Sequence, residues 1–100
     1  MYEVSSEVYL EAAERLLSLL SLSDYYSGSF EFESNGLSCR MVLSAVIYGH
    51  YEQLPEGVQN RVIDNIIPVW WEFHTTDESG ERLNDFDFSE FRKVLAEITR

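Results

Sequence analysis

The chain has 100 residues, of which 45% are hydrophobic and 14% aromatic, and eighteen acidic residues against seven Lys and Arg give a net charge of −11. This length and composition predict one folded domain with a real core and exclude a disordered chain. The charge excludes direct binding to nucleic acid or to an anionic membrane, because both need clustered basic residues. It suits a basic protein partner, or simply keeps the protein soluble.

Cysteine usage and the chain start bear on location. Cys39 is the single cysteine, so no intramolecular disulfide can form, and no CxxC pair or Cys/His cluster indicates zinc. The first residues lack the pattern of a secretory signal, and no uncharged apolar stretch approaches the ~20 residues that span a bilayer. We expect a cytoplasmic protein that binds neither metal nor cofactor.

Residues 4–22 are predicted to form an amphipathic helix, since apolar residues recur there at spacings of three and four. Ser5 or Ser6 is the expected N-cap, Glu7 favours the first turn, and residues 21–24 are expected to end the helix. The predicted buried stripe consists of Val8, Ala12, Leu16, Leu19 and Leu20.

A β-hairpin follows, because Asn35 and Gly36 between two alternating runs favour a type I′ turn. The turn pairs Ser34 with Leu37. The same register predicts Phe32 opposite Cys39, Phe30 opposite Met41, Glu31 opposite Arg40 and Glu33 opposite Ser38. The second strand continues to residue 47, and there both odd and even positions are apolar. We therefore expect both of its faces to be covered there.

A type I turn at residues 54–57 leads to a third strand over residues 61–75, with a short helix over 58–66 as the alternative. Pro68 predicts a bulge or an unpaired edge. Beyond it, Val69, Trp71 and Phe73 are expected on the buried face, and Trp70, Glu72 and His74 on the other.

The C-terminal part is predicted as a polar turn at residues 77–80, a short strand over 81–84 and a helix. Asp87 as N-cap with Glu90 predicts a capping box, and Phe86 with Phe91 a hydrophobic staple. The helix is expected to bury Phe88, Phe91, Val94, Leu95 and Ile98. The fold class is therefore α+β over residues 1–100, an antiparallel four-stranded meander with N- and C-terminal amphipathic helices in the order α-β-β-β-β-α.

No catalytic pattern emerges from the residue types. His50, His74 and Cys39 lie on different strands without ligand-like spacing, Cys39 is expected in the core, and no GxSxG elbow occurs. Paired acids are abundant, but a charge of −11 produces them without any catalytic role. We predict no catalytic residue, metal site or cofactor site.

Two features favour binding: Trp70 on the polar face of its strand, and an acidic stretch over residues 72–90. The predicted partner-binding residues are Trp70, Glu72, His74, Asp77, Glu78, Glu81 and Asp85. A competing interpretation gives these residues no role in binding. In it, which we expect, the C-terminal helix or a loop covers Trp70, and the acids form a solvated loop and helix start.

The leading hypothesis is a non-catalytic interaction module that binds a basic protein, in its sharper form a stoichiometric inhibitor such as an immunity protein or a DNA mimic. One alternative is a small-ligand-binding protein or enzyme, with a pocket between sheet and helices lined by Tyr residues and His50. Another is a homo-oligomer or chaperone-like dimer that uses an uncovered sheet face. Partner identity, oligomeric state and biological process do not follow from these residues.

Overall fold

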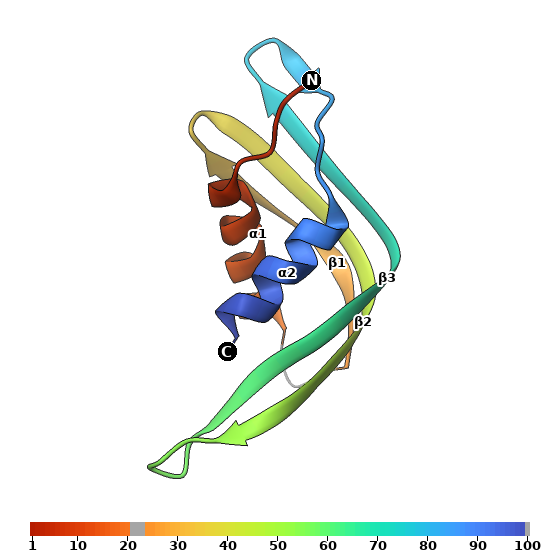
Figure 1. Ribbon diagram of the computed structural model, residues 1–100. Coiled ribbons are helices and arrows are strands. Elements are labelled where there is room, and N and C mark those ends of the chain that lie inside the picture. The colour runs from red at the N-terminus through yellow and green to blue at the C-terminus, as the bar shows by residue number, and fades with distance from the viewer. Residues whose placement is uncertain (21–23, 100) are drawn as a thin grey trace.

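The computed structural model describes residues 1–20 and 24–99 and contains one antiparallel sheet with two helices (Figure 1). The strands are in the order β1-β2-β3-β4, and each pairs antiparallel with the next. The predicted meander and the predicted order of elements are therefore confirmed. The elements are α1 (Ser6–Leu19), β1 (Tyr25–Ser34), β2 (Leu37–Gln53), β3 (Gln59–Asp77), β4 (Gly80–Arg82) and α2 (Phe88–Ile98).

Both helices lie on the same face of the sheet, where the core forms (Figure 1). Successive residues of a strand point to opposite faces, so every second residue of each long strand meets the helices. The core includes Val8, Ala12, Leu16, Phe32, Cys39, Met41, Leu43, Ala45, Ile47, Ile66, Phe73, Phe91 and Leu95.

Helix α1 begins as predicted and ends earlier. Ser5 is the N-cap, and its Oγ accepts a hydrogen bond from the Val8 N–H. The stripe of residues spaced by four runs to Leu20, the C-cap, whose N–H donates to the Leu16 carbonyl. Leu19 lies off that stripe and is 51% exposed, so its predicted burial is wrong. Of the predicted stop at residues 21–24, positions 21–23 lie outside the described residues.

The β1–β2 hairpin has the predicted register at all five pairs, from Ser34 opposite Leu37 to Phe30 opposite Met41. Asn35 and Gly36 have φ of 52° and 79°, as a type I′ turn requires. Cys39 is buried opposite Phe32, as expected. The local sequence around the turn therefore specifies this part of the sheet completely.

Strands β2 and β3 continue past the helices as a two-stranded arm (Figure 1), which gives the molecule dimensions of 50 × 26 × 19 Å. The predicted turn closes the arm: the Gly57 N–H donates to the Leu54 carbonyl at 3.3 Å, and Gly57 has φ of 79°. Residues 59–66 are strand, so the helical alternative is wrong. Gly49 lies at a bulge, where a Cβ would come within 2.4 Å of the Val62 carbonyl oxygen.

Pro68 marks the predicted bulge, because Ala45 pairs with Pro68 while the preceding residue, Ser44, pairs with Trp70. Val69 is the extra residue of this bulge and is 67% exposed, so its predicted place on the buried face is wrong. Trp71 is also more exposed than predicted, at 36%. Its ring packs against two phenylalanines at the start of α2, Phe86 at 5.4 Å and Phe88 at 5.8 Å between ring centroids.

The second face of β2 differs from the expectation that both faces are covered. Val42 and Val46, on the face away from the helices, are half-buried. The two described helices lie on the other face of the sheet (Figure 1), and Val42 and Val46 are flanked on this face by their paired residues on β1 and β3. The prediction is therefore wrong, and the sheet has one open face.

The start of α2 follows the predicted staple, with the Phe86 and Phe91 rings 5.7 Å apart. Asp87 is the N-cap and accepts from the Ser89 N–H. The predicted return bond of the capping box is replaced, because the Asp87 N–H donates to the Tyr9 hydroxyl at 2.9 Å. Glu90 instead pairs with Lys93.

The last strand is shorter than predicted and ends at Arg82, ahead of residues 83 and 84.

Candidate binding surface on the open face of the sheet

The open face consists of the side chains of β1 to β4 that point away from the helices. Directly paired residues on neighbouring antiparallel strands share a face, so the register arranges these side chains in rows across the sheet. From the β4 end toward the arm, the rows are Glu33, Ser38, Thr76 and Glu81; Glu31, Arg40 and His74; Ser29, Val42 and Glu72; Ser27, Ser44 and Trp70; Tyr25, Val46 and Ile67.

These rows divide the open face into two zones of different chemistry. The charged zone lies toward β4 and contains Glu31, Glu33, Arg40, Glu72, His74 and Glu81. The uncharged zone lies toward the arm and contains Tyr25, Ser27, Ser44, Val46, Ile67 and Trp70. A quarter of the chain is charged, so an uncharged zone of this extent sets this part of the surface apart.

Trp70 stands where the two zones meet. Its side chain is 60% exposed, so the expectation that the C-terminal helix or a loop covers it is wrong. The indole Nε1 donates to Glu72 Oε2 at 2.8 Å, which anchors the ring beside the charged zone. The result is an aromatic surface available to a partner and held by one hydrogen bond.

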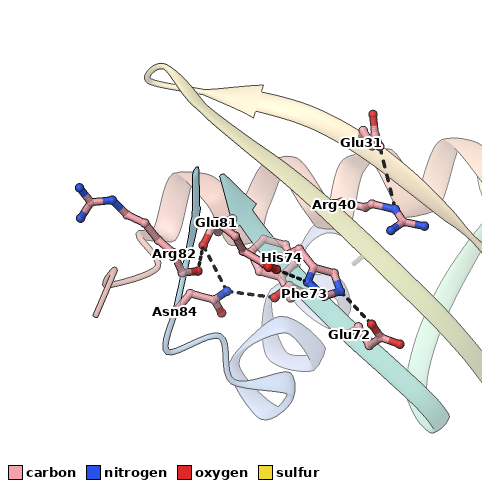
Figure 2. Close-up of polar contacts among 9 residues, drawn as sticks. Glu31, Arg40, Glu72, Phe73, His74, Glu81, Arg82 and Asn84 are labelled. Atoms are coloured by element: carbon pink, nitrogen blue, oxygen red, sulfur yellow. Dashed lines mark hydrogen bonds and ion pairs between the residues drawn. The ribbon is translucent and has the colours of Figure 1, made fainter. Parts of the chain in front are cut away.

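His74 lies between two carboxylates from different strands (Figure 2). Its Nε2 is 2.8 Å from Glu72 Oε1 on β3, and its Nδ1 is 2.7 Å from Glu81 Oε1 on β4. A neutral imidazole has a single N–H, so only the protonated ring donates to both carboxylates. Beside this group, Arg40 Nε lies 4.0 Å from Glu31 Oε1.

The carboxylates shift the ionisation of this group. The hydrogen bonds to Glu72 and then Glu81 raise the pKa of His74 above its ordinary value. The pKa of Glu72 is lowered, first by the Trp70 indole and then by His74. Trp70, Glu72, His74 and Glu81 therefore form one polar chain across β3 and β4.

The stability of the protein is expected to fall as pH rises above the ordinary histidine pKa of about 6.5. His74 binds its proton more tightly in the folded state than in the unfolded state. Its contribution to the free energy of unfolding is therefore complete below the unfolded pKa and is lost as the pH rises through the raised folded pKa. Urea unfolding between pH 5.5 and pH 8.5 measures the effect, with His74→Asn expected to reduce the slope.

The pKa of His50 is raised as well, so His50→Asn should also reduce the slope and the double variant should remove most of it. A wild-type stability that rises over this pH range would contradict the assignment. On the acid side, Glu72 acts oppositely: its depressed pKa gives stability that is lost as pH falls through the folded value.

That second histidine, on the arm, has the same arrangement. His50 Nδ1 lies 2.7 Å from Asp64 Oδ2, and its Nε2 lies 3.1 Å from Glu52 Oε1. These hydrogen bonds, that to Asp64 foremost, raise the pKa of His50. The sequence spacing could have indicated both pairs, because Glu72 and His74, like His50 and Glu52, are two residues apart on one strand face.

The structure brings four of the seven predicted partner-binding residues together: Trp70, Glu72, His74 and Glu81. The others lie elsewhere. Asp77 accepts from the Ser79 N–H and pairs with Arg82, Asp85 accepts from the Val4 N–H at 2.7 Å, and Glu78 is exposed in the β3–β4 turn. The first two of these acids have structural partners. The sequence prediction did not include Glu31, Glu33 or Arg40, which only the register of β1 and β2 brings to the charged zone.

His74 and the buried Cys39 are two side chains with the chemistry of a base and of a nucleophile. Both ring nitrogens of His74 are already hydrogen-bonded to carboxylates, and burial raises the pKa of the Cys39 thiol to about 11, so neither group is a ready base or nucleophile. Within residues 1–20 and 24–99 no three His, Cys, Asp or Glu side chains are placed to hold a metal ion. No helix in this part of the chain is long and apolar enough to cross a membrane.

Two hollows of about 460 and 410 Å³ lie beside His74, and Glu81 lines both. Their size is in the range of small-ligand sites, so the small-ligand alternative keeps a candidate location. That location is at the β3–β4 end of the sheet, whereas the expected pocket involved His50, which lines neither hollow.

Comparison of the chain with protein-family models, with curated proteins and with solved structures finds no match in any of the three.

Proposed function

We propose that the protein is a non-catalytic binding module that docks a basic protein partner on the open face of its sheet. The observation that carries this proposal is Trp70, which is 60% exposed at the boundary between the charged and the uncharged zone. Tryptophan is enriched among the residues that dominate binding energy at protein interfaces. An interface usually has an apolar core beside polar residues of its rim, and here the uncharged zone adjoins the charged zone along one side.

The residues of the charged zone indicate the chemistry of the partner. The charged zone has four carboxylates and a single guanidinium, on a protein of net charge −11. Lys or Arg residues next to an apolar patch would complement the two zones, and opposite potentials also speed association. A stoichiometric inhibitor of a basic protein is the sharper form of this proposal. A DNA mimic fits less well, because half of the face carries no charge to stand in for phosphates.

A second copy of the chain is the less favourable occupant. Two copies each carry −11, and packing their open faces together would bring eight carboxylates of the charged zones into one interface. We also propose a cytoplasmic location, supported by the single cysteine, which is buried as a free thiol.

A peptide-display selection against the purified protein tests the charge of the partner. We expect recovered peptides to combine Lys or Arg with apolar residues, and to bind less tightly at about 300 mM than at about 50 mM salt in calorimetry. The double variant Glu72→Gln/Glu81→Gln should weaken binding about three- to tenfold, since exposed ion pairs contribute up to about 1 kcal/mol each.

Glu14→Gln is the matched control for the charge change, because Glu14 is exposed on α1, away from the open face. It should leave the affinity within about twofold of the wild type. Recovery of neutral or acidic peptides, or an equal loss in Glu14→Gln, would refute the charge assignment. A dimer by light scattering that the peptides cannot dissociate would identify the second copy as the occupant.

A further inference from the structure

The outer edge of β1 has backbone groups that no described residue engages. The Ile47 N–H donates to the Asp24 carbonyl, which makes residues 24 and 47 a hydrogen-bonded pair. Such pairs alternate along an antiparallel ladder, so Phe30 and Phe32 also bond to β2. The residues that alternate with these bonded positions direct their N–H and C=O groups outward; they are Ser27, Ser29, Glu31 and Glu33. All four are exposed.

The opposite edge of the sheet, along β3, is protected against strand addition at several points. Side chains engage its outward groups: Thr99 Oγ1 accepts from the Ile63 N–H, Asn65 Oδ1 accepts from the Ile66 N–H, and Asn84 Nδ2 donates to the Phe73 carbonyl. Pro68 lacks an N–H and lies in a bulge. Bulges, proline and covering groups are the devices that prevent strand addition at an edge.

We infer that the edge of β1 accepts an extended segment of the partner as an added strand. The inference rests on the proposed function for the charge of that partner and adds the way in which it binds. Strand addition supplies backbone hydrogen bonds, while alternate side chains of the segment confer specificity. It would extend the open face by one strand, next to Glu31 and Glu33.

The side chains of β1 define which segment fits. Residues of the added strand that face the helix-free side lie opposite Glu31 and Glu33, where opposite charges stabilise cross-strand pairs. The alternate residues of the added strand lie beside Gly28 and Phe30, where an apolar side chain meets the half-buried Phe30 ring and the Tyr26 ring that lies against Gly28. The segment is therefore an extended run in which Lys or Arg alternates with apolar residues.

Hydrogen exchange by NMR tests this inference, with an octapeptide of alternating lysine and valine as the probe. In the free protein the amides of Ser29 and Glu31 should exchange rapidly, while those of Phe30 and Phe32 are slow. At a peptide concentration of ten times its Kd, the outward amides should exchange about tenfold more slowly. A peptide of the same charge with a central proline is the control, because it cannot form the ladder.

Unchanged exchange of Ser29 and Glu31 at saturating peptide would overturn the inference, as would equal binding of the proline-containing peptide. A second variant, Ser29→Pro, removes an outward donor and leaves the bonds of Phe30 to β2, so it should abolish the protection. If peptides from the display selection still bind and lose affinity in Glu72→Gln/Glu81→Gln while edge exchange stays fast, the edge inference fails and the proposed function stands. If they do not bind, the proposed function fails.

Discussion

Replacing Phe91 by alanine is expected to lower the free energy of unfolding by about 3–5 kcal/mol, the range for truncating a buried phenylalanine. Its side chain is fully buried and contacts the Phe86 ring at 5.7 Å and the Phe88 ring at 5.5 Å between centroids. Phe86 in turn stacks on Phe73 of β3 at 4.2 Å. Removing the ring therefore leaves a cavity where α2 joins the sheet.

Urea unfolding followed by circular dichroism measures this loss as a lower midpoint with an unchanged slope. Leu83→Ala is the control, because Leu83 is 82% exposed and its truncation should change stability by less than about 0.5 kcal/mol. A loss in Phe91→Ala no larger than that of the control would show that α2 does not pack on the sheet as described.

The sequence predicts the parts of the fold that depend on local signals. The Asn35-Gly36 turn determines its own register, and the staple of Phe86 and Phe91 identifies the start of α2. These features need only residues close together in the chain. The predicted capping box is only half correct, because the Asp87 N–H donates to Tyr9, which is distant in sequence.

The errors fall where burial depends on the whole architecture. An apolar run at both parities of β2 suggests two covered faces, but the flanking strands suffice to half-bury Val42 and Val46. The alternation after Pro68 fails at Val69, because a bulge adds a residue without changing the apolar pattern. Trp71 stays partly exposed although its ring packs against Phe86 and Phe88.

The candidate site was predictable in part. Trp70, Glu72 and His74 alternate on one strand, so their shared face follows from sequence alone. Glu81 joins them because the β3–β4 hairpin brings it back beside His74. Asp77 and Asp85 are near them in sequence but lie apart from this group, and their carboxylates hold a turn and the N-terminal segment. The uncharged zone required three strands in register and was not predictable from any one of them.

The second large effect is expected at Trp70, whose replacement by serine should weaken binding of the selected basic peptides by about thirtyfold or more. That loss corresponds to the 2 kcal/mol or more typical of an interface hot spot. Stability should change little, because most of the side chain is exposed and its hydrogen bond to Glu72 lies at the surface.

Calorimetry tests the open face as the docking surface most directly. It compares, side by side, the affinities of Trp70→Ser and Leu83→Ser for one such peptide. Both variants remove an exposed apolar side chain, but Leu83 lies outside the rows of the open face. We predict the loss of about thirtyfold in Trp70→Ser alone, with Leu83→Ser within about twofold of the wild type. Equal affinities of Trp70→Ser and the wild type, or equal losses in both variants, would contradict the account.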